Sequence, residues 1–131
     1  MNIKYKYKKA GNFYRPIIDI TLKQDKIEFG YFALVDSGAD FCIFHTGIAS
    51  LLKIDINKLK KDTFSGIGKG KKLTSYLGAI EIGVKNYFYN TPVFFSDEIS
   101  TNSYGVLGQV GFFDRFKVNF NYKNKTIFVK H

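Results

Sequence analysis

Residues Leu34-Val35-Asp36-Ser37-Gly38-Ala39 place a carboxylate at the end of an apolar segment and directly before a glycine turn. Tyr31 to Val35 is predicted to be a strand, and the chain becomes apolar again from Phe41 to Phe44. An acid between two such segments is expected to be at least partly buried, which costs free energy unless its charge is compensated. Asp36 therefore has either a local role, capping its own backbone in an Asx turn, or a chemical one.

The composition is that of one β-rich domain spanning residues 1–131. Aromatic residues make up 18% of the chain, with 14 Phe and 9 Tyr, and this favours strands. No apolar run approaches the roughly 18 residues of a membrane span, and no apolar segment follows the lysine-rich N-terminus. We therefore expect a cytoplasmic protein without a membrane partner. The single Cys excludes an internal disulfide, which fits a reducing compartment.

The formal net charge of +9 raises the question of a nucleic-acid partner. The lysines are spread along the chain, mostly at alternate or loop positions, which is typical of the solvated faces of strands and turns. We therefore expect no nucleic-acid partner. A small basic β-barrel that binds nucleic acid through Lys and Tyr surfaces is the less favoured alternative. The lysines occur in Lys4 to Lys9, Lys53 to Lys61, Lys69 to Lys72 and Lys117 to Lys130.

Hydrophobic alternation predicts a mainly β chain with one or two short helices. In the predicted strand from Ile17 to Lys23, the side chains of Ile18, Ile20 and Leu22 face inward. Short helices are predicted over 47–53 and around 110–114, and the glycines of 65–72 predict a hairpin tip. The predicted strands cover residues 2–8, 17–23, 27–35, 75–84, 87–95, 106–108, 116–122 and 126–129.

The motifs of several known catalytic and cofactor sites are absent from the sequence. It has no Gly-x-Ser-x-Gly elbow, no Gly-x-x-x-x-Gly-Lys-Ser/Thr phosphate loop and no His-Glu-x-x-His metal helix. Two His and one Cys are too few for a standard zinc site, so neither a metal nor a cofactor is expected. Alternation would place Cys42 and His45 on opposite faces of a strand, which indicates a buried thiol and a strand-end His rather than a catalytic pair.

In the order of its motifs the chain resembles single-domain, retropepsin-like aspartic proteases, from about Arg15 to Val129. The centre of the resemblance is Phe32 to Asp40, Phe-Ala-Leu-Val-Asp-Ser-Gly-Ala-Asp, which is similar to the catalytic motif of that family. The other matching stretches are the opening strand Arg15 to Ile20, the glycine-rich flap Phe64 to Gly70, the apolar-apolar-Gly element Val106 to Gly108 and the helix Gln109 to Phe116.

The resemblance implies a closed or partly open β-barrel and an aspartic endopeptidase that is active as a homodimer on a peptide or protein substrate. One Asp from each subunit would then form the pair of carboxylates that activates a water molecule. A dimer of the same fold that binds peptide or protein without cleaving it is the main alternative. The implied catalytic residues are Asp36, Ser37 and Gly38, and the implied substrate-binding residues are Ala39, Asp40, Gly66, Ile67 and Gly68.

Two positions depart from the family's usual pattern. Ser37 replaces the more frequent Thr and keeps its hydroxyl. Gln109 stands where retroviral enzymes carry an Arg that pairs with the second acid of the motif, so the usual partner of Asp40 is missing.

The alternating N-terminal strand and the strand from Thr126 to Val129 are candidates for a sheet shared between subunits.

Overall fold

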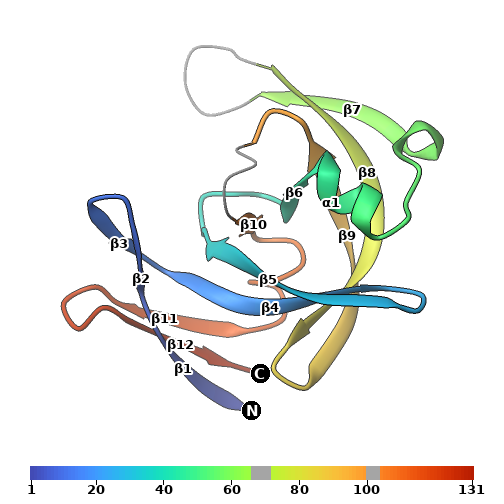
Figure 1. Ribbon diagram of the computed structural model, residues 1–131. Coiled ribbons are helices and arrows are strands. Elements are labelled where there is room, and N and C mark those ends of the chain that lie inside the picture. Colours follow the sequence, from blue (N-terminus) through green and yellow to red (C-terminus); the bar gives the residue numbers. More distant parts are fainter. Residues whose placement is uncertain (66–71, 100–103) are drawn as a thin grey trace.

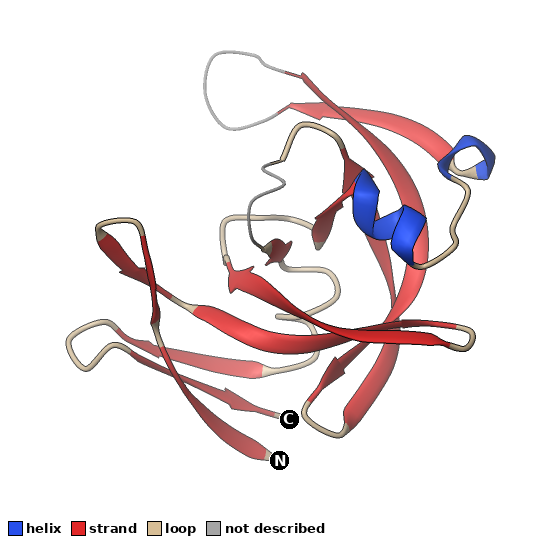
Figure 2. Ribbon diagram, in the orientation of Figure 1, coloured by secondary structure: helices blue, strands red, loops and turns tan. Residues whose placement is uncertain are grey.

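The computed structural model describes residues 1–65, 72–99 and 104–131, and within them the chain is mainly β (Figures 1 and 2). None of the described helices is long and apolar enough to cross a membrane. In chain order the elements are β1 (Asn2–Lys6), β2 (Lys8–Ala10), β3 (Phe13–Arg15), β4 (Ile17–Gln24), β5 (Ile27–Val35), β6 (Ile43–His45), α1 (Thr46–Leu51), the 3-10 helix η1 (Ile56–Lys58), β7 (Lys60–Ser65), β8 (Lys72–Val84), β9 (Tyr87–Ser96), β10 (Gly105–Leu107), β11 (Lys117–Asn121) and β12 (Thr126–Lys130).

Six strands form a closed ring in the order β4, β5, β10, β6, β9 and β8, and the pairing of β4 with β8 closes it. The pairs β5–β10 and β6–β9 are parallel, and the other pairs in the ring are antiparallel. Strand β7 lies outside the ring and pairs with one end of the long strand β8. Closure gives every strand of the ring two neighbours and confirms the predicted β-barrel.

Alternating side chains fill the interior of the barrel. Ile18, Ile20 and Leu22 of β4 are buried, as predicted, while Asp19 between them is exposed. Full burial of an apolar side chain of this size contributes roughly 1.5–3 kcal/mol, so the inward faces of the strands supply most of the stabilising free energy. The largest fully buried side chains include Phe44, Phe95 and Phe112.

The two ends of the chain form a three-stranded antiparallel sheet in the order β1, β12, β11, here called the terminal sheet (Figure 1). Its inner face packs against the barrel through Ile127 and Val129, which are both fully buried. Because β12 is the central strand, both of its edges are already paired within one chain. A sheet shared between subunits would therefore have to use the outer edge of β1 or of β11 rather than the predicted strand 126–129.

The predicted N-terminal strand 2–8 is divided in the structure. β1 ends at Lys6, and the Tyr7 N–H donates to the Lys125 carbonyl at 2.8 Å, outside the regular pairing of β1. β2 then begins at Lys8 and forms a short hairpin with β3. The N-terminal segment therefore contacts two sheets rather than one.

The helix predicted around residues 110–114 does not form, and this part of the prediction is wrong. Gly111 has a φ of +103°, and a Cβ there would lie 2.7 Å from Thr91 Oγ1, so the chain turns sharply where a helix would have to continue. The Asp114 carboxylate accepts a hydrogen bond from the Gly111 N–H at 3.1 Å and stabilises the turn. The other predicted helix is α1, which ends at Leu51 shortly before Lys53 adopts a φ of 61°.

Candidate active site

Asp36 directly follows β5, where a second strand lies beside it. β5 and β10 run parallel, with Val35 next to Leu107. The Asp36 N–H donates to the Leu107 carbonyl at 3.0 Å and continues this pairing one residue beyond the strand. The apolar-apolar-Gly element thus lies alongside the start of the Asp-Ser-Gly turn and fixes it through the backbone.

The same element also holds the far end of the turn. The Gln109 N–H donates to the Ala39 carbonyl at 2.8 Å, and the Val110 N–H donates to the Asp40 carbonyl at 2.9 Å. A Cβ at Gly108 would lie 2.6 Å from the Ala39 carbonyl oxygen, and still closer to that of Phe41. Only glycine allows the two backbones to approach this closely, which accounts for the Gly of the apolar-apolar-Gly element.

The carboxylate of Asp36 is half-buried and is oriented by its own turn. Its Oδ1 accepts a hydrogen bond from the Gly38 N–H at 2.9 Å, and the Ala39 N–H donates to the Asp36 carbonyl at 3.1 Å. Within the part of the chain that the structure describes, the second carboxylate oxygen has no hydrogen-bond partner. The local Asx turn predicted as one reading of Asp36 is therefore present, and it leaves one carboxylate oxygen free for a further group.

Gln109 contacts the turn rather than Asp40. Its Nε2 donates to the Ser37 carbonyl at 2.5 Å. Asp40 is exposed, and no residue within 1–65, 72–99 or 104–131 forms a hydrogen bond or an ion pair with its carboxylate. From the sequence it was predicted only that the usual Arg is missing. The contact between Gln109 and the Ser37 carbonyl had a single sequence signal, a polar side chain directly after Val-Leu-Gly.

The predicted substrate-binding residues are only partly visible in the structure. Ala39 is half-buried on the turn, and Asp40 beside it is exposed. Gly66, Ile67 and Gly68 lie outside the described residues, so their predicted role stays a prediction. The strands on either side of that segment pair in antiparallel register up to Ser65 and Lys72.

Cys42 and His45 have the structural roles that the sequence predicted. The Cys42 thiol is fully buried beside the Gly108 N–H and the Val110 carbonyl, and burial raises the pKa of this thiol to about 12. A thiol in this state is not a nucleophile near neutral pH. His45 ends β6 and accepts a hydrogen bond from the Gly47 N–H at 2.9 Å at the start of α1.

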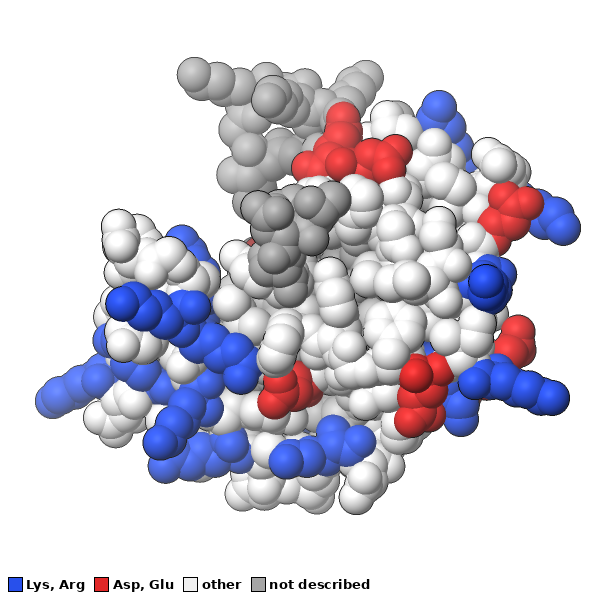
Figure 3. Space-filling model, viewed as in Figure 1, with Lys and Arg blue, Asp and Glu red and all other residues white. Residues whose placement is uncertain are grey.

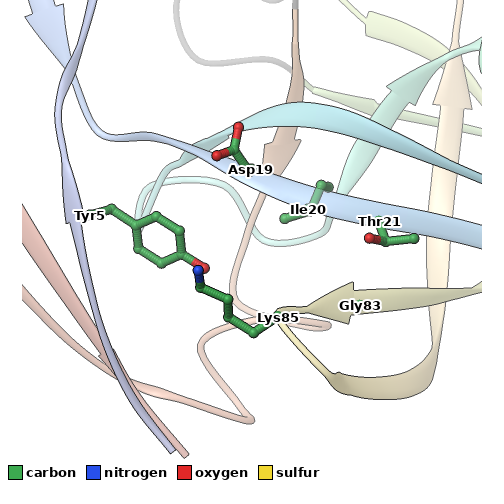
Figure 4. Close-up of a pocket in the computed structure, with 6 residues that line it drawn as sticks. All are labelled: Tyr5, Asp19, Ile20, Thr21, Gly83 and Lys85. Carbon is green, nitrogen blue, oxygen red and sulfur yellow. The ribbon is translucent and has the colours of Figure 1, made fainter.

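Two cavities open on the outer surface of β4, away from Asp36. The smaller, of about 140 Å³, lies between β1, β4 and the turn after β8, and Tyr5 and Lys85 point toward each other across it (Figure 4). Burial raises the pKa of Tyr5, and nearby Asp19 adds to the effect. The larger cavity, of about 480 Å³, reaches Tyr31 and Phe32 on β5. Neither is lined by the Asp-Ser-Gly turn.

No group of three or more His, Cys, Asp or Glu side chains in the described ranges is arranged to hold a metal ion. The Asp36 carboxylate has a fixed orientation, and one of its oxygens has no partner among the described residues.

Comparison with solved structures identifies the fold. The chain is similar to a retropepsin-like aspartic protease from Rickettsia conorii, with a TM-score of 0.67 and 16% sequence identity, over 98% of this chain and 89% of that one. It is also similar to EIAV protease complexed with the inhibitor HBY-793, with a TM-score of 0.51 and 21% identity, over 78% of this chain and 88% of that one.

No protein-family model matches the sequence, and no curated protein matches it. At these low identities the likeness establishes the fold alone, which is that of the retropepsin-like aspartic proteases. The fold implied by the sequence motifs is thereby confirmed.

Proposed function

We propose that this protein is an aspartic endopeptidase that acts as a homodimer, with Asp36 of each subunit forming the catalytic pair. The observation that carries the proposal is the Asp-Ser-Gly turn, which is held at both ends by the strand crossing of a retropepsin-like fold. The carboxylate in this turn has a fixed orientation and one oxygen without a partner among the described residues.

Hydrolysis of a peptide bond without a metal or a covalent nucleophile needs two groups, one that takes a proton from water and one that gives a proton to the carbonyl oxygen. Two carboxylates about 3 Å apart cannot both be ionised, so the pair holds one proton and supplies both groups. The chain contains a single Asp-Ser-Gly triplet, so a second chain must bring the second carboxylate. A two-fold axis between the two turns provides this arrangement in a closed dimer.

In this proposal the remaining residues of the motif position the carboxylates and the substrate. Ser37 is exposed next to Asp36, where its hydroxyl can donate across the axis to the partner turn. Gly38 orients Asp36 through its N–H and offers no side chain to an approaching peptide. Ala39, Asp40 and the segment 66–68 would contact the backbone of a substrate that is bound in an extended conformation along the site.

The first test is proteolysis of a mixture of unstructured peptides between about pH 4 and pH 7, the range in which a proton-sharing carboxylate pair operates. We expect cleavage by the unmodified protein, inhibition by a pepstatin-type compound and loss of cleavage in Asp36→Asn. The matched control is Asp25→Asn, which makes the same chemical change in the turn between β4 and β5. Cleavage that survives Asp36→Asn would reject the proposal, and peptide binding without cleavage by the unmodified protein would favour the non-catalytic alternative.

The second test asks whether the two subunits share one site. Unmodified protein is mixed with Asp36→Asn at a constant total concentration, and activity is measured after the subunits have exchanged. If each site needs both carboxylates, an equal mixture retains about one quarter of the activity, since only dimers of two unmodified chains are competent. Retention of about one half would mean that each chain acts alone and would contradict the shared pair.

A further inference from the structure

The positive charge of this protein is concentrated in its two terminal segments. Residues 1–15 and 115–131 together contain ten Lys and Arg and no Asp or Glu. The rest of the chain contains ten Lys and Arg and eleven acids, and is therefore close to neutral. Thus the whole net charge of +9 comes from two segments at opposite ends of the sequence, although lysines also occur in between.

The fold brings these two segments together. β1 pairs with β12, and β12 pairs with β11, so that both charged ends share the terminal sheet. Figure 3 shows Lys and Arg side chains gathered at the lower left of the molecule, where Figure 1 places β1, β2, β3, β11 and β12. Fields from charges of one sign on one surface add, and they attract a polyanion to that surface.

The exposed side of the terminal sheet, here called the outer face, combines these cations with an aromatic ring. In one row across the three strands Lys4 lies beside Phe128, and in a neighbouring row Lys130 lies beside Lys117. All four side chains are exposed, and the Lys4 Nζ lies 5.9 Å from the centre of the Phe128 ring. No acid occurs on β1, β11 or β12, so nothing on these strands neutralises the cations.

A second aromatic and cationic pair lies at the turn between β11 and β12, where the Tyr122 ring contacts Tyr7 on the side of the sheet that faces the core. Tyr122 is 63% exposed, and the Lys125 Nζ lies 3.4 Å from the centre of its ring. Exposed rings are platforms on which bases stack, and neighbouring lysines pair with phosphates. On the outer face, Phe128 and the lysines around it supply both kinds of side chain.

We propose that the outer face of the terminal sheet binds single-stranded nucleic acid, independently of the Asp36 site. Three strands of five residues span about 10 Å by 17 Å, which suits a few nucleotides of one extended strand. The outer face favours this occupant over a lipid surface, because its ring, Phe128, is only 39% exposed and lies within the sheet instead of projecting as an anchor. Phe128 also favours a single strand over a duplex, whose bases are stacked on each other and unavailable to a protein ring.

The test is fluorescence anisotropy with a labelled oligouridine of about 20 nucleotides, measured from about 50 to 200 mM salt. The triple variant Lys4→Gln, Lys117→Gln, Lys130→Gln removes three charges from the outer face. We expect at least about tenfold weaker binding at low salt. The slope of the logarithm of the binding constant against the logarithm of the salt concentration should also be smaller by about two. Phe128→Thr should weaken binding about tenfold and leave the salt dependence unchanged, because it removes stacking but no charge.

The matched control is the triple variant Lys58→Gln, Lys60→Gln, Lys61→Gln, which removes the same charge from three exposed residues of η1 and β7. It should bind nearly as tightly as the unmodified protein. Equal losses in the two triple variants would mean that net charge alone drives binding, and would overturn the proposal.

Two further results would also reject the proposal. One is no binding of the oligonucleotide at about 50 mM salt. The other is binding only to vesicles of equal parts phosphatidylserine and phosphatidylcholine, which would make the face a membrane surface. Asp36→Asn should bind the oligonucleotide like the unmodified protein, so failure of this proposal and failure of the protease proposal are distinguishable.

Discussion

Backbone contacts hold the turn that carries Asp36 in position, whereas side-chain packing holds the terminal sheet. In the turn, backbone groups do the positioning: Asp36, Ala39 and Asp40 are each held by a main-chain bond to the segment 107–110. In the terminal sheet, side chains do it: Ile127 and Val129 are buried against the core, and Phe128 between them is exposed.

Because of this difference, the two regions leave different groups exposed to a partner. Because backbone bonds fix the turn, one oxygen of the Asp36 carboxylate is left without a partner among the described residues. Because every outer-face residue of the terminal strands except Thr126 is at least partly exposed, this side can carry charge. The first region is therefore sensitive to small changes in backbone packing, and the second is sensitive only on its buried side.

The largest expected effect is on the backbone contact of the turn. Gly108→Ala would place a Cβ 2.4 Å from the Phe41 carbonyl oxygen, where backbone cannot give way, so we expect at least about 4 kcal/mol of lost stability. Gly30→Ala is the control, since its Cβ would meet nothing closer than 4.0 Å and should leave stability unchanged or slightly higher. Urea unfolding measures both. Equal stability of the two variants would show that the close approach is not what holds the turn.

An intermediate effect is expected on the buried side of the terminal sheet. Ile127→Ala removes a fully buried side chain and should cost about 3 kcal/mol of unfolding free energy. Phe128→Thr, its neighbour on the outer face, should cost about 1 kcal/mol or less, since that ring is partly exposed. The same unfolding measurement compares them. A larger loss for Phe128→Thr would mean that the outer face is structural and is not free for a partner.

The smallest effect is expected from the side chain that supports the turn. Gln109→Ala removes the hydrogen bond from Nε2 to the Ser37 carbonyl and should cost about 1 kcal/mol or less, because the group is exposed. The effect should be local, with faster amide hydrogen exchange at Gly38 and Ala39 and unchanged exchange in β12. Asn119→Ala, a change of similar size on the outer face, should not alter exchange in the turn. Equal exchange in both variants would show that Gln109 does not hold the turn.

The sequence predicted those features that depend on short stretches of chain. The alternation of Ile18, Ile20 and Leu22 fixed the inward face of β4, and the apolar run before Asp36 predicted a strand that ends in a turn. The order of motifs was enough to predict the barrel, because the fold places each of them at a characteristic point of the chain. Asp36 itself was found because it alone of eleven acids ends an apolar strand at a glycine turn.

Features that depend on contacts between distant segments were missed. The helix around 110–114 was predicted from local spacing, but Gly111 packs so closely on Thr91 and Cys42 that the chain has to turn there. The acceptor of the Gln109 side chain is 72 residues away in the sequence. The gathering of charge on one surface was missed for the same reason, since the two basic segments come together only when the chain ends pair.

That pairing also has a consequence for how the chain could be reconnected. Met1 and His131 lie next to each other, with the His131 N–H donating to the Met1 carbonyl at 3.1 Å (Figure 1). A tight turn joining them would convert β11, β12 and β1 into a simple three-stranded meander. New ends opened at the exposed Lys85–Asn86 turn would then give a circular permutant with the same set of strand neighbours.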